Sequence, residues 1–320
     1  MSRAADVGTA TQIVLAVAVA PMLVGVTRQT RARLEGRAGA GWRQPYRDLR
    51  KLLRKQSLRP RGTTIVFAAA PLLVAASTLA AAGLVPIVVA SPTTTRIGDL
   101  FVVVGLLLFG TVTLALAGLD SGTAFGGMGA SRTITMAALV EPSLLLAVFA
   151  LSVPVRSTSL AAIVTSVAAH PETVARPGAV LAGAALVVAV LAETGRLPID
   201  NPATHLELTM VHEAMTLEYA GPRLAVIEWA SALRLTVLLA LLANLFWPAG
   251  IAIHNVSAPA LLLATVAITA KLVVLAAVLG GAEVLLAKLR LFRVPELLAG
   301  AFLLGLLAVT TSSVLSVNAS

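Results

Sequence analysis

The sequence contains 320 residues, of which 58% are hydrophobic and only 12% are charged, a composition far too apolar for a soluble globular domain. It contains no cysteine, which excludes thiolate-ligated iron–sulfur clusters, nickel–iron centres, zinc–thiolate sites and disulfides. Half of the basic residues behind the net charge of +9 fall within residues 28–61, so this charge indicates membrane topology and predicts no nucleic-acid partner.

Eight apolar runs divide the chain, and each is about as long as a helix that crosses the roughly 30 Å hydrocarbon core of a bilayer. They cover about 11–27, 64–90, 99–118, 133–153, 178–193, 225–246, 259–280 and 297–316. No polar helix faces or alternating strands remain that could cover a soluble core. We therefore predict an all-α polytopic membrane protein, with residues 1–320 forming a single integral membrane domain of about eight transmembrane helices.

The loops between these runs carry very different amounts of basic charge. The loops after the first, third, fifth and seventh runs hold eighteen Lys and Arg residues, whereas the alternate loops and the N-terminus hold four. These basic loops span about 28–63, 119–132, 194–224 and 281–296. By the positive-inside rule they face the cytoplasm, which predicts a multi-pass protein of the cell membrane with both termini outside.

The first basic loop contains a segment with the pattern of an amphipathic helix. Trp42, Tyr46, Leu49 and Leu53 recur at i, i+4, i+7 and i+11, and the positions between them are mostly basic. We expect this helix to lie on the cytoplasmic surface of the membrane. Two roles remain open for it: it anchors the protein to anionic lipid headgroups, or it forms a docking platform for a soluble partner.

The second basic loop contains the glycine-rich segment 126–129, which reads Gly-Gly-Met-Gly. A dinucleotide-binding loop would follow a β-strand and open a helix, whereas this segment lies between two membrane spans with no strand before it. We therefore expect a close-packed cytoplasmic turn at this position.

The third basic loop is rich in ionisable residues and predicts a helix at about 202–220. Asn201 followed by Pro202 is typical of a helix start, and Gly221 followed by Pro222 of a helix stop. Four polar side chains would share one face of this helix, and two carboxylates would share another. The first set is His205, Thr209, His212 and Thr216, and the second is Glu207 and Glu218.

No metal site is predicted in this loop. His212 and Glu213 begin like the zinc-protease motif H-E-x-x-H, but Thr216 occupies the position of the second histidine. His205 and His212 would lie two helical turns apart, about 10.5 Å, which is too far for them to bind one ion together.

Five ionisable residues lie within or at the ends of the predicted spans, where a charge at the bilayer centre costs at least about 2.5–3.5 kcal/mol. They are Glu141, Glu193, Glu228, Arg234 and Lys271. These side chains should therefore face the bundle interior, a partner or water. Two interpretations remain open: they form a hydrated proton path, or they form structural ion pairs such as Glu141 with Lys271.

Three segments of the predicted cytoplasmic side together resemble the complex I subunit 1 family, and within it the hydrogenase branch of the formate hydrogenlyase subunit 4 type. They are residues 36–37 with 44–55, residues 126–132 with Glu141-Pro142, and residues 193–215, which read ETGRLPIDNPATHLELTMVHEAM, with 217–219. Gly195 before Arg196, and the presence of His205 and His212, differ from the pattern of the quinone-reducing branch.

The resemblance implies a non-catalytic membrane subunit that has no redox centre, cofactor or metal of its own. It implies peripheral nickel–iron hydrogenase and iron–sulfur subunits and antiporter-like membrane subunits as partners, in addition to the lipid bilayer. The alternative function is the quinone-pocket subunit of a complex I-like NADH dehydrogenase. A free-standing ion transporter fits less well, because the sequence shows no inverted repeat with paired broken spans.

Two sets of residues are candidates for the function that the resemblance implies. The proton-path candidates are Glu141, Glu193, Glu213, Glu218, Glu228 and Lys271. The candidates for partner docking or loop structure are Arg37, Gln44, Tyr46, Arg47, Asp48, Arg50, Lys51, Arg196, Asp200, His205, Glu207 and His212.

Overall fold

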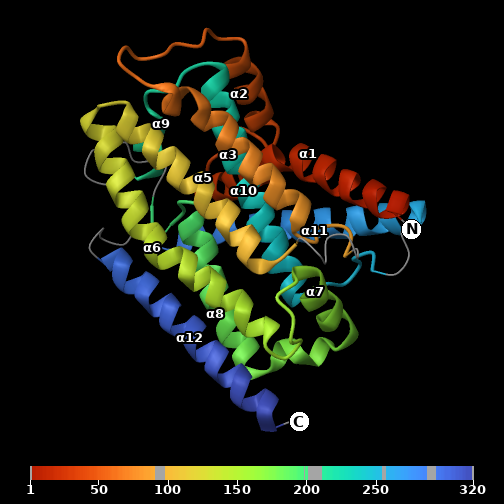
Figure 1. Cartoon of the computed structure of the whole chain (residues 1–320). Coiled ribbons are helices and arrows are strands. Elements are labelled where there is room, and N and C mark those ends of the chain that lie inside the picture. The colour runs from red at the N-terminus through yellow and green to blue at the C-terminus, as the bar shows by residue number, and fades with distance from the viewer. Residues whose placement is uncertain are drawn as a thin grey trace.

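The computed structural model describes residues 2–90, 98–197, 199–200, 211–253, 257–286 and 293–318. Within these ranges eight long helices each overlap one of the predicted spans, which confirms the all-α polytopic fold (Figure 1). Seven of them are long and apolar enough to cross a membrane, and α8, with 17 residues, is shorter. The eight are α1 (Ser2–Leu34), α3 (Ile65–Leu84), α5 (Leu100–Asp120), α6 (Ala124–Ser152), α8 (Pro177–Glu193), α10 (Pro222–Phe246), α11 (Ala258–Leu285) and α12 (Val294–Asn318).

Shorter helices lie at both ends of the bundle. α2 (Gln44–Leu53) and α9 (His212–Thr216) lie at one end, which we call the basic end because the 43–61 segment belongs to it (Figure 1). α7 (Leu160–Ala169) and the 3₁₀ turn η1 (Pro171–Ala175) lie toward the other end. The sequence did not predict α7, whose apolar side chains pack into the core.

The central helix of the bundle is α10. It packs against α1, α3, α8 and α11, and 67% of its apolar window is buried, compared with 28% in α11 and α12. The outer helices expose large apolar side chains such as Leu72, Phe101 and Val274, as expected for surfaces that face hydrocarbon. Because polar side chains are costly in contact with lipid, the central position of α10 is where Arg234 and Asn244 can be accommodated.

Helix α6 begins nine residues earlier than the predicted fourth span, so the predicted turn at 126–129 is wrong. The turn lies at 121–123 instead, where Gly122 has a φ of +67°, and the Thr123 side chain caps the helix by accepting from the Gly126 amide at 3.1 Å. The predicted close packing is present, because a Cβ at Gly129 would lie 2.9 Å from the Cβ of Ala214 on α9. Gly129 therefore lets α9 approach the face of α6, and Gly126 lies against the backbone of Gly118 on α5.

Helix α3 ends at Leu84, and residues 85–90, which were predicted to continue the span, are non-helical and buried. Backbone at this depth needs internal hydrogen-bond partners, because hydrocarbon offers none. The fully buried Gln12 of α1 supplies them. Its amide nitrogen donates at 2.9–3.0 Å to the carbonyls of Ala82, Gly83 and Val85, and its oxygen accepts from the amides of Ile87 and Val88.

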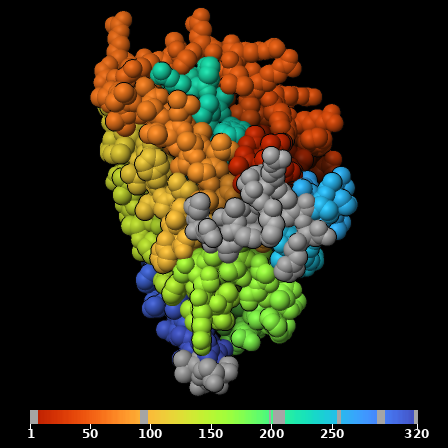
Figure 2. All heavy atoms as spheres, turned by 45° about the vertical axis from the view of Figure 1, so that its right-hand side comes forward, coloured from red at the N-terminus to blue at the C-terminus, as the bar shows by residue number. Residues whose placement is uncertain are grey.

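The amphipathic helix α2 is pinned to α1. The Tyr46 hydroxyl donates to the Ala18 carbonyl at 2.5 Å, and the absence of a side chain at Gly25 makes room for the backbone of Trp42. Burial raises the pKa of the Tyr46 phenol above its ordinary value. The long side chains of this segment extend from the basic end in Figure 2. They include the exposed residues Arg43, Arg47, Arg50, Lys51, Arg54 and Lys55.

Candidate functional site

A buried guanidinium lies between two carboxylates where α10, α8 and α6 meet. Arg234 Nη2 pairs with Glu193 Oε2 and lies 3.7 Å from Glu141 Oε1. Both carboxylates are more than 90% buried, and the two oxygens of Glu141 have no hydrogen-bond partner among the residues that the structure describes. Arg234 lies about 18 Å from the start of α10 by helical rise. One positive charge therefore serves two buried carboxylates.

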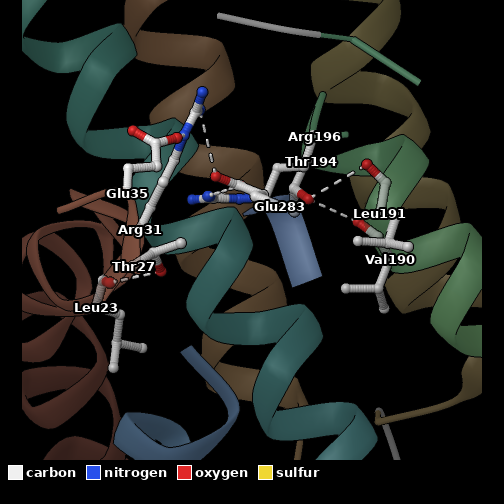
Figure 3. Close-up of polar contacts among 9 residues, drawn as sticks. All are labelled: Leu23, Thr27, Arg31, Glu35, Val190, Leu191, Thr194, Arg196 and Glu283. Carbon is white, nitrogen blue, oxygen red and sulfur yellow. Dashed lines mark hydrogen bonds and ion pairs between the residues drawn. The ribbon is translucent and has the colours of Figure 1, made fainter. Parts of the chain in front are cut away.

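A second charged cluster joins α1, α11 and the segment after α8 (Figure 3). Glu283 of α11 is 93% buried, and its two oxygens lie 2.6 Å from Arg196 Nη1 and 3.7 Å from Arg31 Nη1. Arg31 also binds Glu35 at 2.9 Å, and Glu35 in turn pairs with Arg37. This cluster therefore ties three separate elements together at the basic end.

The sequence did not predict a site role for Glu283, because the seventh span was predicted to end at 280. The helix continues to Leu285. The signal was the spacing of Leu272, Ala276, Leu279 and Glu283 at i, i+4, i+7 and i+11, which places Glu283 on the buried face. A Cβ at Gly280 would lie 2.5 Å from the Thr27 carbonyl, so the glycine allows the close approach that brings Glu283 to Arg31.

A third group consists of His212, Asp200 and Gly195. His212 Nδ1 lies 3.9 Å from Asp200 Oδ2, and the His212 amide donates to the same oxygen at 3.5 Å. Gly195 has a φ of +57°, a conformation that favours glycine. The ring of His212 packs against this glycine.

Members of all three groups line one cavity of about 750 Å³ at the basic end. Its wall also contains apolar side chains such as Val74 and Leu235 and the hydroxyl residues Thr111 and Thr133. The ionisable residues that line it are Arg28, Arg31, Arg37, Glu193, Arg196, Asp200, His212, Glu213, Glu228, Arg234 and Glu283. The cavity thus combines a polar wall with an apolar one, as a water-filled or ligand-binding chamber does.

Several proton-path candidates come together at this cavity and two do not. Glu193, Glu213 and Glu228 line it, and Glu141 contacts its lining residue Arg234. Glu218 is partly buried but outside the lining.

Lys271 lies elsewhere, and the ion pair with Glu141 that the sequence left open does not form. The Lys271 ammonium donates to the Trp247 carbonyl at 2.6 Å and to Asn244 Oδ1 at 3.4 Å. Asn244 is ten residues beyond Arg234 on α10, about 15 Å along the axis. Sequence depth alone suggested the pair, but the direction in which each helix points its side chain decides the partners.

The predicted helix at 202–220 is shorter in the part that the structure describes. It covers His212–Thr216, and residues 201–210, including His205 and Glu207, lie outside the described residues. Beyond this helix, Tyr219 stacks on Phe67 of α3 at 4.0 Å between ring centroids and donates to its carbonyl at 2.9 Å. Burial raises the pKa of the Tyr219 phenol.

The docking candidates on α2 divide into residues that bond within the bundle and residues that are exposed. Gln44 donates to Asp48 at 2.9 Å along the helix, and Tyr46 points to α1. Arg47, Arg50 and Lys51 are exposed. Among the described residues no group of three or more His, Asp or Glu side chains could hold a metal ion.

The fold and the cavity define a polytopic membrane subunit with buried, paired charges at one end of its helix bundle. The chain matches the family model described as NADH dehydrogenase over residues 8–313, and it belongs to this family. This result confirms the resemblance that the loop motifs predicted.

Similar proteins include two from Escherichia coli (strain K12). Formate hydrogenlyase subunit 4 is 35% identical over 286 residues, which cover 89% of this chain and 92% of the relative. Hydrogenase-4 component C is 34% identical over 242 residues, or 75% and 74% of the two chains. A subunit of the NADH-quinone oxidoreductase of Syntrophobacter fumaroxidans is 31% identical over 254 residues, or 73% and 74%.

A solved structure also has a similar fold. A chain of the membrane-bound sulfane sulfur reductase, an archaeal respiratory membrane complex, aligns with a TM-score of 0.81 at 18% identity. The alignment covers 96% of this chain and 99% of that chain. At this identity the likeness supports the fold alone.

Proposed function

We propose that this chain is the membrane anchor subunit of a membrane-bound hydrogenase complex of the formate hydrogenlyase type. Two relatives, 35% and 34% identical over the aligned residues, are named as a formate hydrogenlyase subunit and a hydrogenase-4 component. The first aligns over 89% of this chain. The partners of the chain are therefore other subunits of a membrane complex. In this proposal they are peripheral nickel–iron hydrogenase and iron–sulfur subunits and antiporter-like membrane subunits.

The basic end is the docking surface for the peripheral arm in this proposal. Its exposed Arg and Lys residues on α2 point away from the bundle (Figure 2), and α2 itself is held rigidly on α1 by the Tyr46 hydrogen bond. A charged helix that is already held in place suits an interface, because few groups have to become ordered on binding. The positive-inside rule orients this end to the cytoplasm, with both termini outside the cell membrane.

Charge reversal tests this docking surface. The double substitution Arg47→Glu with Arg50→Glu should release the arm from the membrane subunit, measured by co-purification in mild detergent. The matched control reverses Arg156 and Arg176, which lie at the opposite end of the bundle. Retention of the arm by the α2 variant would assign the basic helix to lipid binding alone.

Proton coupling is the second part of the proposal, and the observation that carries it is Glu141 beside Arg234. One guanidinium neutralises one carboxylate, so the Glu141–Arg234–Glu193 cluster retains one unit of negative charge in a buried site. A bound proton removes that charge. The cluster can thus hold and release one proton next to a cavity that Glu213 and Glu228 also line.

Glu141→Gln tests the coupling. It should leave assembly and hydrogenase activity with a soluble electron acceptor unchanged, but abolish proton movement into sealed vesicles during turnover. Glu172→Gln, at an exposed position of the opposite end, is the control and should couple normally. Full proton movement in Glu141→Gln would refute the role of Glu141.

The alternative function, a quinone-pocket subunit of a complex I-like NADH dehydrogenase, is favoured by one observation. The 750 Å³ cavity has a partly apolar wall and a volume typical of a small-molecule site. The relative named for quinone oxidoreduction is less similar and aligns over less of this chain. Addition of ubiquinone or menaquinone analogues should not alter turnover of the complex, and competitive inhibition by them would favour the alternative.

A further inference from the structure

The two sides of the His212 imidazole lie in different surroundings. Nδ1 is fully buried, lies 3.9 Å from Asp200 Oδ2 and has no hydrogen-bond partner among the described residues. The side chain as a whole is 39% exposed, so its exposure comes from atoms other than Nδ1. An imidazole placed in this way can take a proton from water on one side and face a buried carboxylate on the other.

Gly195 forms the wall behind this ring. A Cβ at position 195 would lie 2.9 Å from Nδ1 and 3.3 Å from Cγ of His212, so the glycine creates the slot that the imidazole fills. Gly195 lies two residues after Glu193, which is the ion-pair partner of Arg234. The same short segment therefore positions His212 and one carboxylate of the buried cluster on a single cavity wall.

Among the residues that the structure describes, the other charged side chains lining the cavity are five arginines and five carboxylates. A proton on His212 therefore adds one positive charge to a described lining that is otherwise balanced. The arginines are 28, 31, 37, 196 and 234, and the carboxylates are 193, 200, 213, 228 and 283. The helices that pack against α9 add Asp120 from α5 and Arg132 and Glu141 from α6.

We propose that His212, positioned by Gly195 and Asp200, is the proton carrier between the solvent at the basic end and the cavity. This inference rests on the proposed proton coupling. The neutral ring, with its proton on Nδ1, accepts a proton from water at Nε2. It returns this proton from Nε2 to cavity water, while the Nδ1 proton stays directed toward Asp200 Oδ2. The ring is then neutral again with its proton on Nδ1, so one proton has moved and no tautomer has to be reset.

The test uses the complete complex in sealed vesicles. His212→Gln should slow coupled proton movement by about tenfold or more. Hydrogenase activity with a soluble acceptor should not change. His170→Gln is the control, because this histidine is exposed at the opposite end of the bundle.

Two further variants separate proton carriage from a structural role. In His212→Ala, added imidazole should restore part of the proton movement, which a packing defect would not allow. Gly195→Ala should produce the same defect as His212→Gln, and combining the two should add nothing further, because the added methyl displaces the ring.

The outcomes distinguish this inference from the function on which it rests. Wild-type proton movement in His212→Gln, while Glu141→Gln remains uncoupled, would overturn the role of His212 alone. Absence of proton movement in the wild-type complex would overturn both. Loss of movement in His212→Ala without any rescue by imidazole would assign His212 a structural role.

Discussion

Removal of the Glu283 carboxylate should destabilise the bundle by about 3 kcal/mol. Glu283→Ala leaves Arg196 without the partner that it contacts at 2.6 Å, whereas Arg31 keeps Glu35 at 2.9 Å. Breaking a buried ion pair by removing one partner costs about 3–5 kcal/mol. The two arginine side chains retain 13% and 21% exposure, so partial solvation places the cost at the lower end of this range.

The assay is the free energy of unfolding of the purified subunit in mixed detergent micelles. Glu35→Ala is the control and should cost no more than about 0.5 kcal/mol, because this pair lies along one helix and is more exposed. Adding Arg196→Ala to Glu283→Ala should recover about 1 kcal/mol or more, since it removes the unpaired charge. A cost for Glu283→Ala equal to that of the control, or a double variant less stable than the single one, would refute this reasoning.

Three further predictions follow from other contacts. Gln12→Leu should lower the free energy of unfolding by about 3 kcal/mol or more, because it leaves buried backbone groups near residues 82–88 without partners; a loss below about 1 kcal/mol would contradict it. Gly25→Leu should detach α2 from α1 and expose it to protease, since the added side chain would overlap Trp42, and unchanged cleavage would argue against close packing. A cysteine introduced at the exposed Ser57 should resist an impermeant thiol reagent in intact cells, and ready labelling would reverse the topology.

Hydropathy predicted the eight helices well, because a span needs about twenty apolar residues whatever its neighbours are. Hydropathy predicted the wrong helix ends where contacts with other helices determine them. The start of α6 was missed because its glycines resemble a turn in sequence, yet they serve close packing against α9 and α5. The end of α3 depends on Gln12, which is distant in sequence and becomes informative only when its partners are known.

The candidate site was predictable as a set of residues but not as an arrangement. The presence of Glu141, Glu193 and Arg234 in apolar spans indicated side chains that face the bundle interior, a partner or water, and the structure brings the three together. The sequence left open a pair of Glu141 with Lys271, and it could not decide this point because depth along a helix does not specify the face on which a side chain lies. Only the structure identified Glu283 as part of the site, because α11 continues past the apolar run that was predicted to end at residue 280.

The proposed function can be tested by affinity purification of the tagged chain in mild detergent, with identification of the subunits that accompany it. We predict that nickel–iron hydrogenase and iron–sulfur subunits co-purify with the wild-type chain, and that they are lost from the Arg47→Glu, Arg50→Glu variant while the membrane subunits remain. Co-purification with a flavin-containing NADH dehydrogenase arm, and with no hydrogenase subunit, would contradict it.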